Sequence, residues 1–145
     1  MEQKSPRIIL AVDVPGRYTG GYAVEGYRDS ILAGDIIFGK NTAEADDYRR
    51  LARLLDSFEP DVLIIEHAFL FAIAGYVGAL KAMAAERDIP WWQVGASKAK
   101  KLVLNKGNST KQEVLDWAQK VMGQPLTQHQ ADSVLYIHAW HKQHD

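Results

Sequence analysis

The sequence predicts an α/β protein with one mixed sheet and helices packed on it. Two short apolar runs, residues 8–12 and 62–65, have the length and composition of fully buried strands. Between and after them lie segments whose apolar residues recur at helical spacing. The predicted order is three strands, a helix, a strand, a helix, a strand and three helices, which is typical of a mixed sheet covered by helices.

Composition bounds the protein and excludes several kinds of site. With 145 residues, 47% of them hydrophobic, the chain can bury one core, so we expect residues 1–145 to form a single domain. The absence of cysteine excludes disulfides, a thiol nucleophile and a zinc–thiolate site. No signal peptide and no membrane-spanning run is evident, so we expect a cytoplasmic protein with no membrane partner.

Charge is unevenly distributed, although the formal net charge is only -1. Residues 89–112 contain no acid, whereas residues 29–66 are rich in Asp and Glu. The lysines of the first region are Lys98, Lys100, Lys101, Lys106 and Lys111. A cationic face apart from an acidic zone suits a metal-dependent enzyme that acts on a polyanion. An ordinary solvated lysine surface is the simpler alternative.

The first half of the chain supplies three strands, a helix and a fourth strand. Strands at 21–25 and 30–38 should form an antiparallel meander with the first strand. Residues 43–58 are predicted to be helical because their large apolar side chains recur at helical spacing, and Pro60 follows the end of this helix. The fourth strand is residues 62–65.

The next predicted helix, residues 72–87, is apolar nearly all round in its first half. Such a helix should be buried on every side. Small residues at Gly75, Gly78 and Ala82 would allow close backbone approach. The helix either packs between the sheet and a second subunit or lies in the centre of the core.

The second half adds a strand at 90–94 and three helices, at 97–104, from Ser109 or Thr110 to 122, and at 128–141. The last two begin with capping-box patterns, in which a threonine is followed three residues later by Glu or Gln. Three histidines three residues apart lie at the end of the chain, and we interpret them as part of a solvated tail rather than a metal site: His138, His141 and His144.

Four residues are candidate metal ligands and catalytic groups. Asp13 and Glu66 are the first charges after the two buried strands, so neighbouring strands would bring them to one edge of the sheet. His129 and Asp132 are three residues apart and share one face of the last helix. Crowded carboxylates repel one another, and Mg²⁺ or Mn²⁺ would relieve this. The alternatives are that Asp13 only opens a turn and that the helical pair is merely exposed to solvent.

Four segments resemble, in order and approximate spacing, the motifs of the RuvC-type Holliday junction resolvases of the RNase H-like superfamily. They are the strand and loop ending at Thr19-Gly20, the segment Ile64-Ile65-Glu66-His67-Ala68-Phe69, the basic segment 96–111, and the helical segment 129–135. Together they cover nearly the whole chain. The sequence departs from the family where Val14 precedes Pro15 and where His129 replaces an Asp found in many members; the chain is also short, as in a phage-type or divergent member.

The resemblance implies an RNase H-like fold with a mixed five-stranded sheet, and an endonuclease that resolves four-way DNA junctions by paired, metal-dependent hydrolysis. Two Mg²⁺ or Mn²⁺ ions per site would be held by Asp13, Glu66, His129 and Asp132. Phe69 would stack on an unpaired base, while Arg17 and the lysines would contact phosphates. The active form would be a homodimer that uses the helix 72–87, in the nucleoid or in the cytoplasm of a phage-infected cell.

Three other functions fit parts of the pattern. A non-catalytic junction-binding module would keep the DNA contacts without the chemistry. Another RNase H-like nuclease would prefer flaps, forks or RNA-containing duplexes. An ATP-binding protein of the sugar-kinase and actin class has an opening Asp-x-Gly phosphate loop that looks much like residues 13–20, but that class needs two such domains.

Overall fold

The sheet has five strands in the order β3-β2-β1-β4-β5. The computed structural model describes residues 8–14, 19–27, 30–37, 44–67 and 71–145. The strands are β1 (Ile9–Asp13), β2 (Thr19–Tyr27), β3 (Ser30–Ile37), β4 (Val62–Glu66) and β5 (Trp91–Val94). β1, β2 and β3 form the expected antiparallel meander, and β4 and β5 continue the sheet in parallel from β1. The two buried strands are therefore neighbours, which is the condition under which Asp13 and Glu66 meet at one edge of the sheet.

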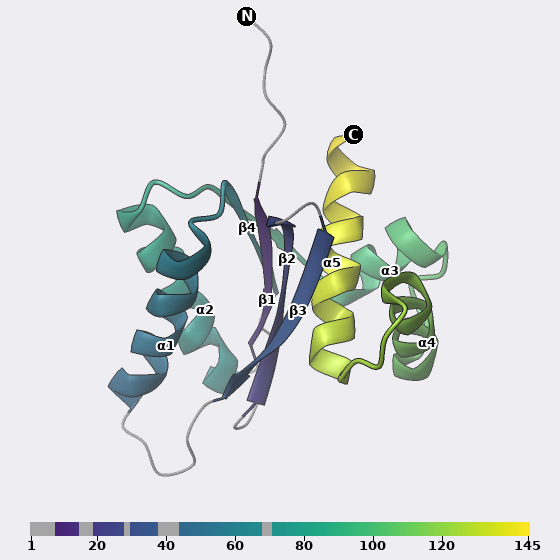
Figure 1. Cartoon of the computed structure of the whole chain (residues 1–145), viewed down its shortest axis with the longest axis horizontal. Helices are drawn as coiled ribbons and strands as arrows, with labels where there is room; N and C mark the ends of the chain where they lie inside the picture. The colour runs from purple at the N-terminus through teal and green to yellow at the C-terminus, as the bar shows by residue number, and fades with distance from the viewer. Residues whose placement is uncertain (1–7, 15–18, 28–29, 38–43, 68–70) are drawn as a thin grey trace, which may run out of the picture.

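Helices cover both faces of this sheet (Figure 1). One face carries α1 (Glu44–Phe58) and α2 (Phe71–Glu86); the other carries α3 (Ala96–Leu104), α4 (Lys111–Met122) and α5 (Gln128–His144). Successive residues of a strand point to opposite faces. In β1, Leu10 and Val12 accordingly belong to the core beneath α1 and α2, while Ile9 and Ala11 belong to the core beneath α5. The fold is thus the predicted α/β class, with a central sheet between two helical layers.

Helices α4 and α5 begin at the predicted caps. The Thr110 side chain accepts a hydrogen bond from the backbone N–H of Glu113, and the Glu113 side chain accepts one from Thr110 N. Thr127 and Gln130 make the same reciprocal pair at α5. Each box satisfies two of the backbone donors that a helix start leaves without a partner within the helix. The first residues of α5 are therefore fixed in position, which matters because His129 lies there.

The expectation that α2 is buried on every side is wrong for this chain by itself. Val77, Leu80 and Ala84 are buried toward the sheet, but Gly78 and Ala82 are exposed on the other side. The exposed residues on this outer side are small, so each of them presents little apolar surface to solvent. The alternative of a central core helix is excluded.

The expectation of a solvated C-terminal tail is met only in part: residues 142–145 are exposed, but α5 continues to His144 and its histidines make specific contacts. The His141 ring nitrogens bond the carboxylates of Glu25 and Asp145. His144 stacks on Trp140 with ring centroids 4.5 Å apart, and His138 meets the edge of Trp117. These contacts hold the last turns of the helix against the sheet and α4. No helix in the described parts of the chain is long and apolar enough to cross a membrane.

Candidate active site

Strand geometry places Asp13 and Glu66 side by side. The parallel register pairs Val12 of β1 with Ile65 of β4, so the residues that follow come to the same level at the ends of both strands. Alternation along each strand turns both carboxylates to the face covered by α5. The two carboxyl groups are close enough for a hydrogen bond between them. The sequence prediction that these two acids meet at one edge of the sheet is confirmed.

Helix α5 brings His129 to the same place. Its Nδ1 lies 2.8 Å from Oδ2 of Asp13, across 116 residues of sequence. This approach requires a glycine on β2: a Cβ at Gly21 would lie 2.7 Å from the backbone carbonyl carbon of His129 and 2.8 Å from the backbone nitrogen of Gln130. The glycine therefore sets how closely the start of α5 can pack against the sheet.

Asp132 lies one helical turn further on and completes the group. Its side chain accepts a hydrogen bond from the Gln128 amide at 3.1 Å. Burial and the negative charge of Asp13 raise the pKa of Asp132 to about 6, against the lesser influence of Gln128, His129 and Lys100. The charge of Asp13 therefore acts on Asp132 as it does on Glu66, and the three acids share one electrostatic environment.

Excess negative charge dominates this environment. Burial, with the added repulsion of Asp13, raises the pKa of Glu66 to about 7. The hydrogen bond with Asp13 raises the pKa of the His129 imidazole, although burial opposes this. One imidazole thus faces three carboxyl groups, and two of those groups hold their protons more tightly than ordinary acids do.

Tyr136 is a site residue that the sequence did not reveal. It lies one turn beyond Asp132 on α5, is 1% exposed, and its side chain hydrogen-bonds with Glu66. Burial raises the pKa of this phenol well above its usual value, so the hydroxyl stays protonated. It therefore donates a hydrogen bond to the Glu66 carboxylate. A single Tyr in a mostly apolar stretch of helix carries no sequence signal that separates it from an ordinary core residue.

The donor set fits a hard divalent cation. Oxygen ligands from three carboxylates with at most one imidazole are those that Mg²⁺ and Mn²⁺ prefer. In the described residues no three His, Asp or Glu side chains are already spaced to hold a metal ion. Instead Asp13 is bonded to His129, and Glu66 is bonded to Tyr136. The candidate ligands lie together, and the raised pKa values of Glu66 and Asp132 reflect burial and negative charge that a bound cation would offset.

Two of the predicted lysines lie close enough to act on this group. Lys100 on α3 is partly buried, and its charge lowers the pKa of Asp132. Lys111 at the start of α4 is exposed, and its charge lowers the pKa of His129. Both effects are minor contributions to those pKa values. They nevertheless place two cations beside the acids, where a bound polyanion would need them.

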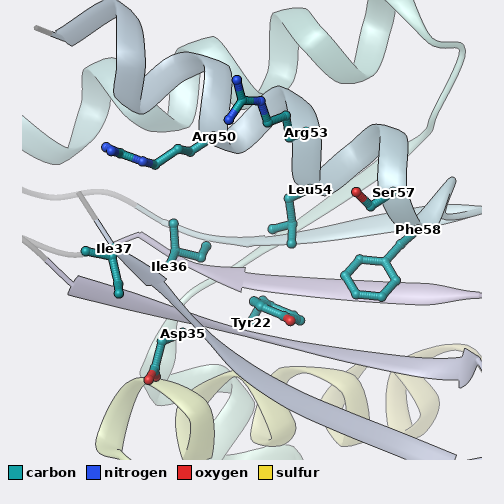
Figure 2. A pocket seen from close by; sticks show the side chains of 9 residues that line it. All are labelled: Tyr22, Asp35, Ile36, Ile37, Arg50, Arg53, Leu54, Ser57 and Phe58. Atoms are coloured by element: carbon teal, nitrogen blue, oxygen red, sulfur yellow. The ribbon is translucent and has the colours of Figure 1, made fainter. Parts of the chain in front are cut away.

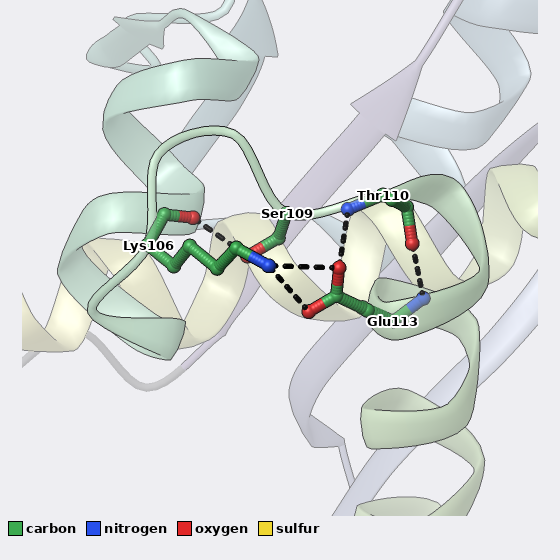
Figure 3. Close-up of polar contacts among 4 residues, drawn as sticks. All are labelled: Lys106, Ser109, Thr110 and Glu113. Atoms are coloured by element: carbon green, nitrogen blue, oxygen red, sulfur yellow. Dashed lines mark hydrogen bonds and ion pairs between the residues drawn. The ribbon is translucent and has the colours of Figure 1, made fainter.

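The other predicted DNA contacts lie further from the acids or outside the described residues. Lys106 bonds both carboxylate oxygens of Glu113, at 3.2 and 3.3 Å, in the turn before α4 (Figure 3). Lys98 and Lys101 line an open pocket of about 760 Å³ beside the end of β4. Arg17 and Phe69 lie outside the described residues, so their predicted roles stay predictions.

Curated relatives of this chain are named crossover junction endodeoxyribonuclease RuvC. The protein of Chlamydia caviae is 25% identical over an alignment of 135 positions, which covers 82% of this chain and 80% of the relative. The protein of Chlamydia pneumoniae is 25% identical over 84% of this chain and 82% of its own. The protein of Chlamydia abortus is 28% identical over 81% of both. No family model matches the chain.

Solved structures with the same fold agree with these relatives. Thermus thermophilus RuvC superposes with a TM-score of 0.74 at 19% identity, over 93% of each chain. The same protein in complex with a Holliday junction substrate gives 0.75 at 18% identity, over 94% of this chain and 96% of that one. The fowlpox virus Holliday junction resolvase gives 0.58 at 17% identity, over 94% and 98%. The chain therefore resembles RuvC proteins in sequence and is built on the same RNase H-like fold as these structures.

Proposed function

We propose that this protein is a crossover junction endodeoxyribonuclease, which resolves four-way DNA junctions by metal-dependent hydrolysis of phosphodiester bonds. One observation carries the proposal: Asp13, Glu66 and Asp132, from two strands and a helix, converge with His129 into one group of excess negative charge. The names of the curated relatives and the junction-bound Thermus thermophilus structure support the same activity.

In this proposal the four residues hold two Mg²⁺ or Mn²⁺ ions. When bound, these ions would polarise the scissile phosphate, activate a water molecule and stabilise the leaving oxygen. Asp13 would be the central ligand, because it bonds the His129 imidazole and its charge raises the pKa of both other acids. Nδ1 of His129 is bonded to Asp13, so His129 would contribute to the chemistry through Nε2.

Tyr136 holds Glu66 in place and keeps its carboxylate available. A buried hydroxyl that donates to a carboxylate favours the ionised form, which is the form that binds a cation. The Gln128 amide acts on Asp132 in the same sense. These two donors partly offset the effect of burial on the pKa values of the two acids.

The DNA would lie over the acids and along α3 and the start of α4. Lys100 and Lys111 would contact phosphates next to the site, which supplies affinity without sequence selectivity. Lys98, Lys101 and Lys106 would extend this contact, and Arg17 and Phe69 would reach the DNA from the loops after β1 and β4. A DNA substrate places the protein in the nucleoid or in the cytoplasm of a phage-infected cell.

Paired nicks in opposite strands require two active sites, and we propose that a homodimer of this single domain supplies them. The outer side of α2 is the proposed interface, because its exposed small residues Gly75, Gly78 and Ala82 would let a second helix approach closely. Sedimentation of the full chain tests this proposal, which predicts the mass of a dimer.

A nicking assay tests the activity. Wild type with Mg²⁺ or Mn²⁺ should nick a four-way junction, whereas Asp13→Asn, Glu66→Gln and Asp132→Asn should bind the junction and lose at least about a hundredfold in rate. Asp116→Asn is the matched control, because Asp116 is an exposed carboxylate on α4 that bonds only Gln112 among the described residues. Junction binding without nicking would indicate a non-catalytic module. Faster cleavage of flaps, forks or RNA-containing duplexes would indicate a different nuclease.

A further inference from the structure

A pocket of about 430 Å³ lies on the face of the sheet opposite the acids, between α1 and the outer strand β3 (Figure 2). Its lining residues come from β2, β3 and α1: Tyr22, Asp35, Ile36, Ile37, Arg50, Arg53, Leu54, Ser57 and Phe58. None of them belongs to the candidate active site, so the pocket calls for an explanation of its own.

The base of the pocket is apolar. Ile36, Leu54 and the packed rings of Tyr22 and Phe58, with centroids 5.5 Å apart, form its floor and one end. The Tyr22 ring lies where a side chain at position 34 would be, since a Cβ at Gly34 would come within 2.4 Å of the phenol. At the other end Ile37 is 65% exposed. The pocket therefore joins an apolar floor to an exposed isoleucine at one end.

Two arginines line the α1 side of the same pocket. Figure 2 shows Arg50 and Arg53 extending from α1 above the strand residues. Arg50 donates one hydrogen bond to Asp47 at 3.0 Å and has further donors, whereas Arg53 makes no ion pair with any described residue. The Asp35 carboxylate points away toward α5, where it accepts a hydrogen bond from Gln130 at 2.9 Å. The pocket therefore combines an apolar floor with two arginines, of which Arg50 is paired with Asp47 and Arg53 has no ion pair among the described residues.

The outer edge of β3 adds a third feature. In the described sheet β3 pairs with β2 alone, so the backbone groups on its other side face outward along eight residues, Ser30–Ile37. Natural edges are usually protected by Lys, Pro or a covering segment. Ser30–Ile37 contains neither Lys nor Pro, and its one charged residue, Asp35, is bonded to α5. Leu32, midway along the strand, is 41% exposed.

We propose that this edge and pocket bind an extended segment of another protein that carries acidic and apolar residues. The segment would pair with β3 as a sixth strand, place an apolar side chain on the floor of the pocket and direct carboxylates to Arg50 and Arg53. Duplex DNA would use the arginines but has no group for the apolar floor, so the pocket favours a peptide. The site lies across the sheet from the acids, so a partner can be held while the candidate active site is engaged.

Binding of a designed peptide tests this without DNA or metal, so its outcome is independent of the nuclease proposal. The probe is a fluorescein-labelled peptide of the same length as β3. Its sequence alternates pairs of valines with pairs of glutamates, so that each face of the extended chain presents both residue types. Fluorescence anisotropy with the full chain should give saturable binding that weakens with added salt. The same peptide with lysine in place of glutamate should not bind, and equal binding of both peptides would overturn the proposal.

Variants locate the contact. Arg53→Glu should weaken binding about tenfold, because a like charge then faces the peptide. Arg49→Glu is the matched control on the same helix, since Arg49 bonds Asp46 and lies outside the pocket. Ile37→Lys changes an exposed residue, so the fold should persist while peptide affinity falls. Equal effects of the changes at positions 49 and 53 would overturn the proposal, because they would indicate general attraction between charges.

Two further measurements separate the other occupants. Two peptides methylated on alternate backbone nitrogens, one at the odd and one at the even positions, should differ in binding. Only one set of N–H groups pairs with β3, so one peptide should lose binding and the other should keep it. Equal affinity of both methylated peptides would exclude strand addition. If Arg53→Glu instead reduces junction binding, or Ile37→Lys changes the oligomeric mass, the pocket serves DNA or a second copy of the chain and the peptide proposal fails.

Discussion

Each end of α5 carries a histidine bonded to a carboxylate of the sheet, but the two pairs lie in different electrostatic surroundings. His129 meets Asp13 near the start of the helix, where Glu66 and Asp132 crowd the same carboxylate. His141 meets Glu25 near its end and binds Asp145 through its other ring nitrogen. At the first end negative charge exceeds positive charge, and at the second a single imidazole links two exposed or half-buried acids.

The difference shows that a histidine–carboxylate pair by itself does not mark a site. What distinguishes the first end is that burial and repulsion raise the pKa of two acids there, to about 7 for Glu66 and about 6 for Asp132. Perturbed pKa values of this kind cluster at functional sites. The second end is surrounded by tryptophan rings and fastens the helix to the sheet.

The largest effect is expected at Gly21, which lets the first end approach β2. Gly21→Ala places a methyl group against the backbone of His129 and Gln130, so strand and helix must separate. We expect a loss of about 3 kcal/mol in the free energy of unfolding, measured in urea, together with loss of nicking. Gly95→Ala is the control for stability, because Gly95 has an ordinary φ of -83° and a Cβ there meets only the His67 ring at 3.6 Å, so the free energy of unfolding should change by no more than about 1 kcal/mol. A Gly21→Ala protein as stable as wild type would refute the close packing.

A smaller effect is expected at Tyr136, the hydroxyl partner of Glu66. Tyr136→Phe removes that donor, so the pKa of Glu66 should rise further and the acid limb of the rate–pH profile should move upward. The nicking rate should fall roughly tenfold. Tyr76→Phe removes a comparable hydroxyl, which donates to Asp47 at 3.0 Å far from the acids, and should leave the profile unchanged. Identical profiles for the two variants would remove Tyr136 from the site.

The smallest effect is expected at the second end. Burial lowers the pKa of His141, but its bonds to Glu25 and Asp145 outweigh this, so the net shift is upward. A raised histidine pKa stabilises the fold below about pH 6.5, and this stabilisation is lost as the pH rises through the folded-state value. His141→Gln should therefore cost under about 1 kcal/mol at pH 5.5 and less at pH 8, measured by thermal unfolding. A cost that grows toward pH 8 would contradict this sign.

Much of the first end could be predicted from the sequence, because strand alternation and helical spacing are local. Asp13 and Glu66 follow buried strands, and His129 and Asp132 share a helix face. Tyr136 could not be predicted, because its hydroxyl matters only through a strand about seventy residues away in sequence. The contacts of His141 at the second end could not be predicted for a similar reason, because its partner Glu25 lies on β2, 116 residues away in sequence. For α2, composition alone did not show that its outer side is uncovered.

The central claim is that Asp13, Glu66 and Asp132 form a cluster of excess negative charge that a divalent cation relieves. Thermal unfolding at pH 8, in EDTA and in Mn²⁺, tests it most directly by comparing wild type with Glu66→Gln. The raised pKa of Glu66 means that its ionisation costs the fold at most about 3 kcal/mol above pH 7, a cost that disappears as the pH falls toward 4.5.

The account predicts that Glu66→Gln raises Tm in EDTA by about 5 °C at pH 8, with a smaller gain at pH 5. Mn²⁺ should raise the Tm of wild type and have little effect on the variant, because binding to the folded state stabilises it only where the ligands are present. A Glu66→Gln protein that melts below wild type in EDTA at pH 8, or an equal response of both proteins to Mn²⁺, would contradict the account.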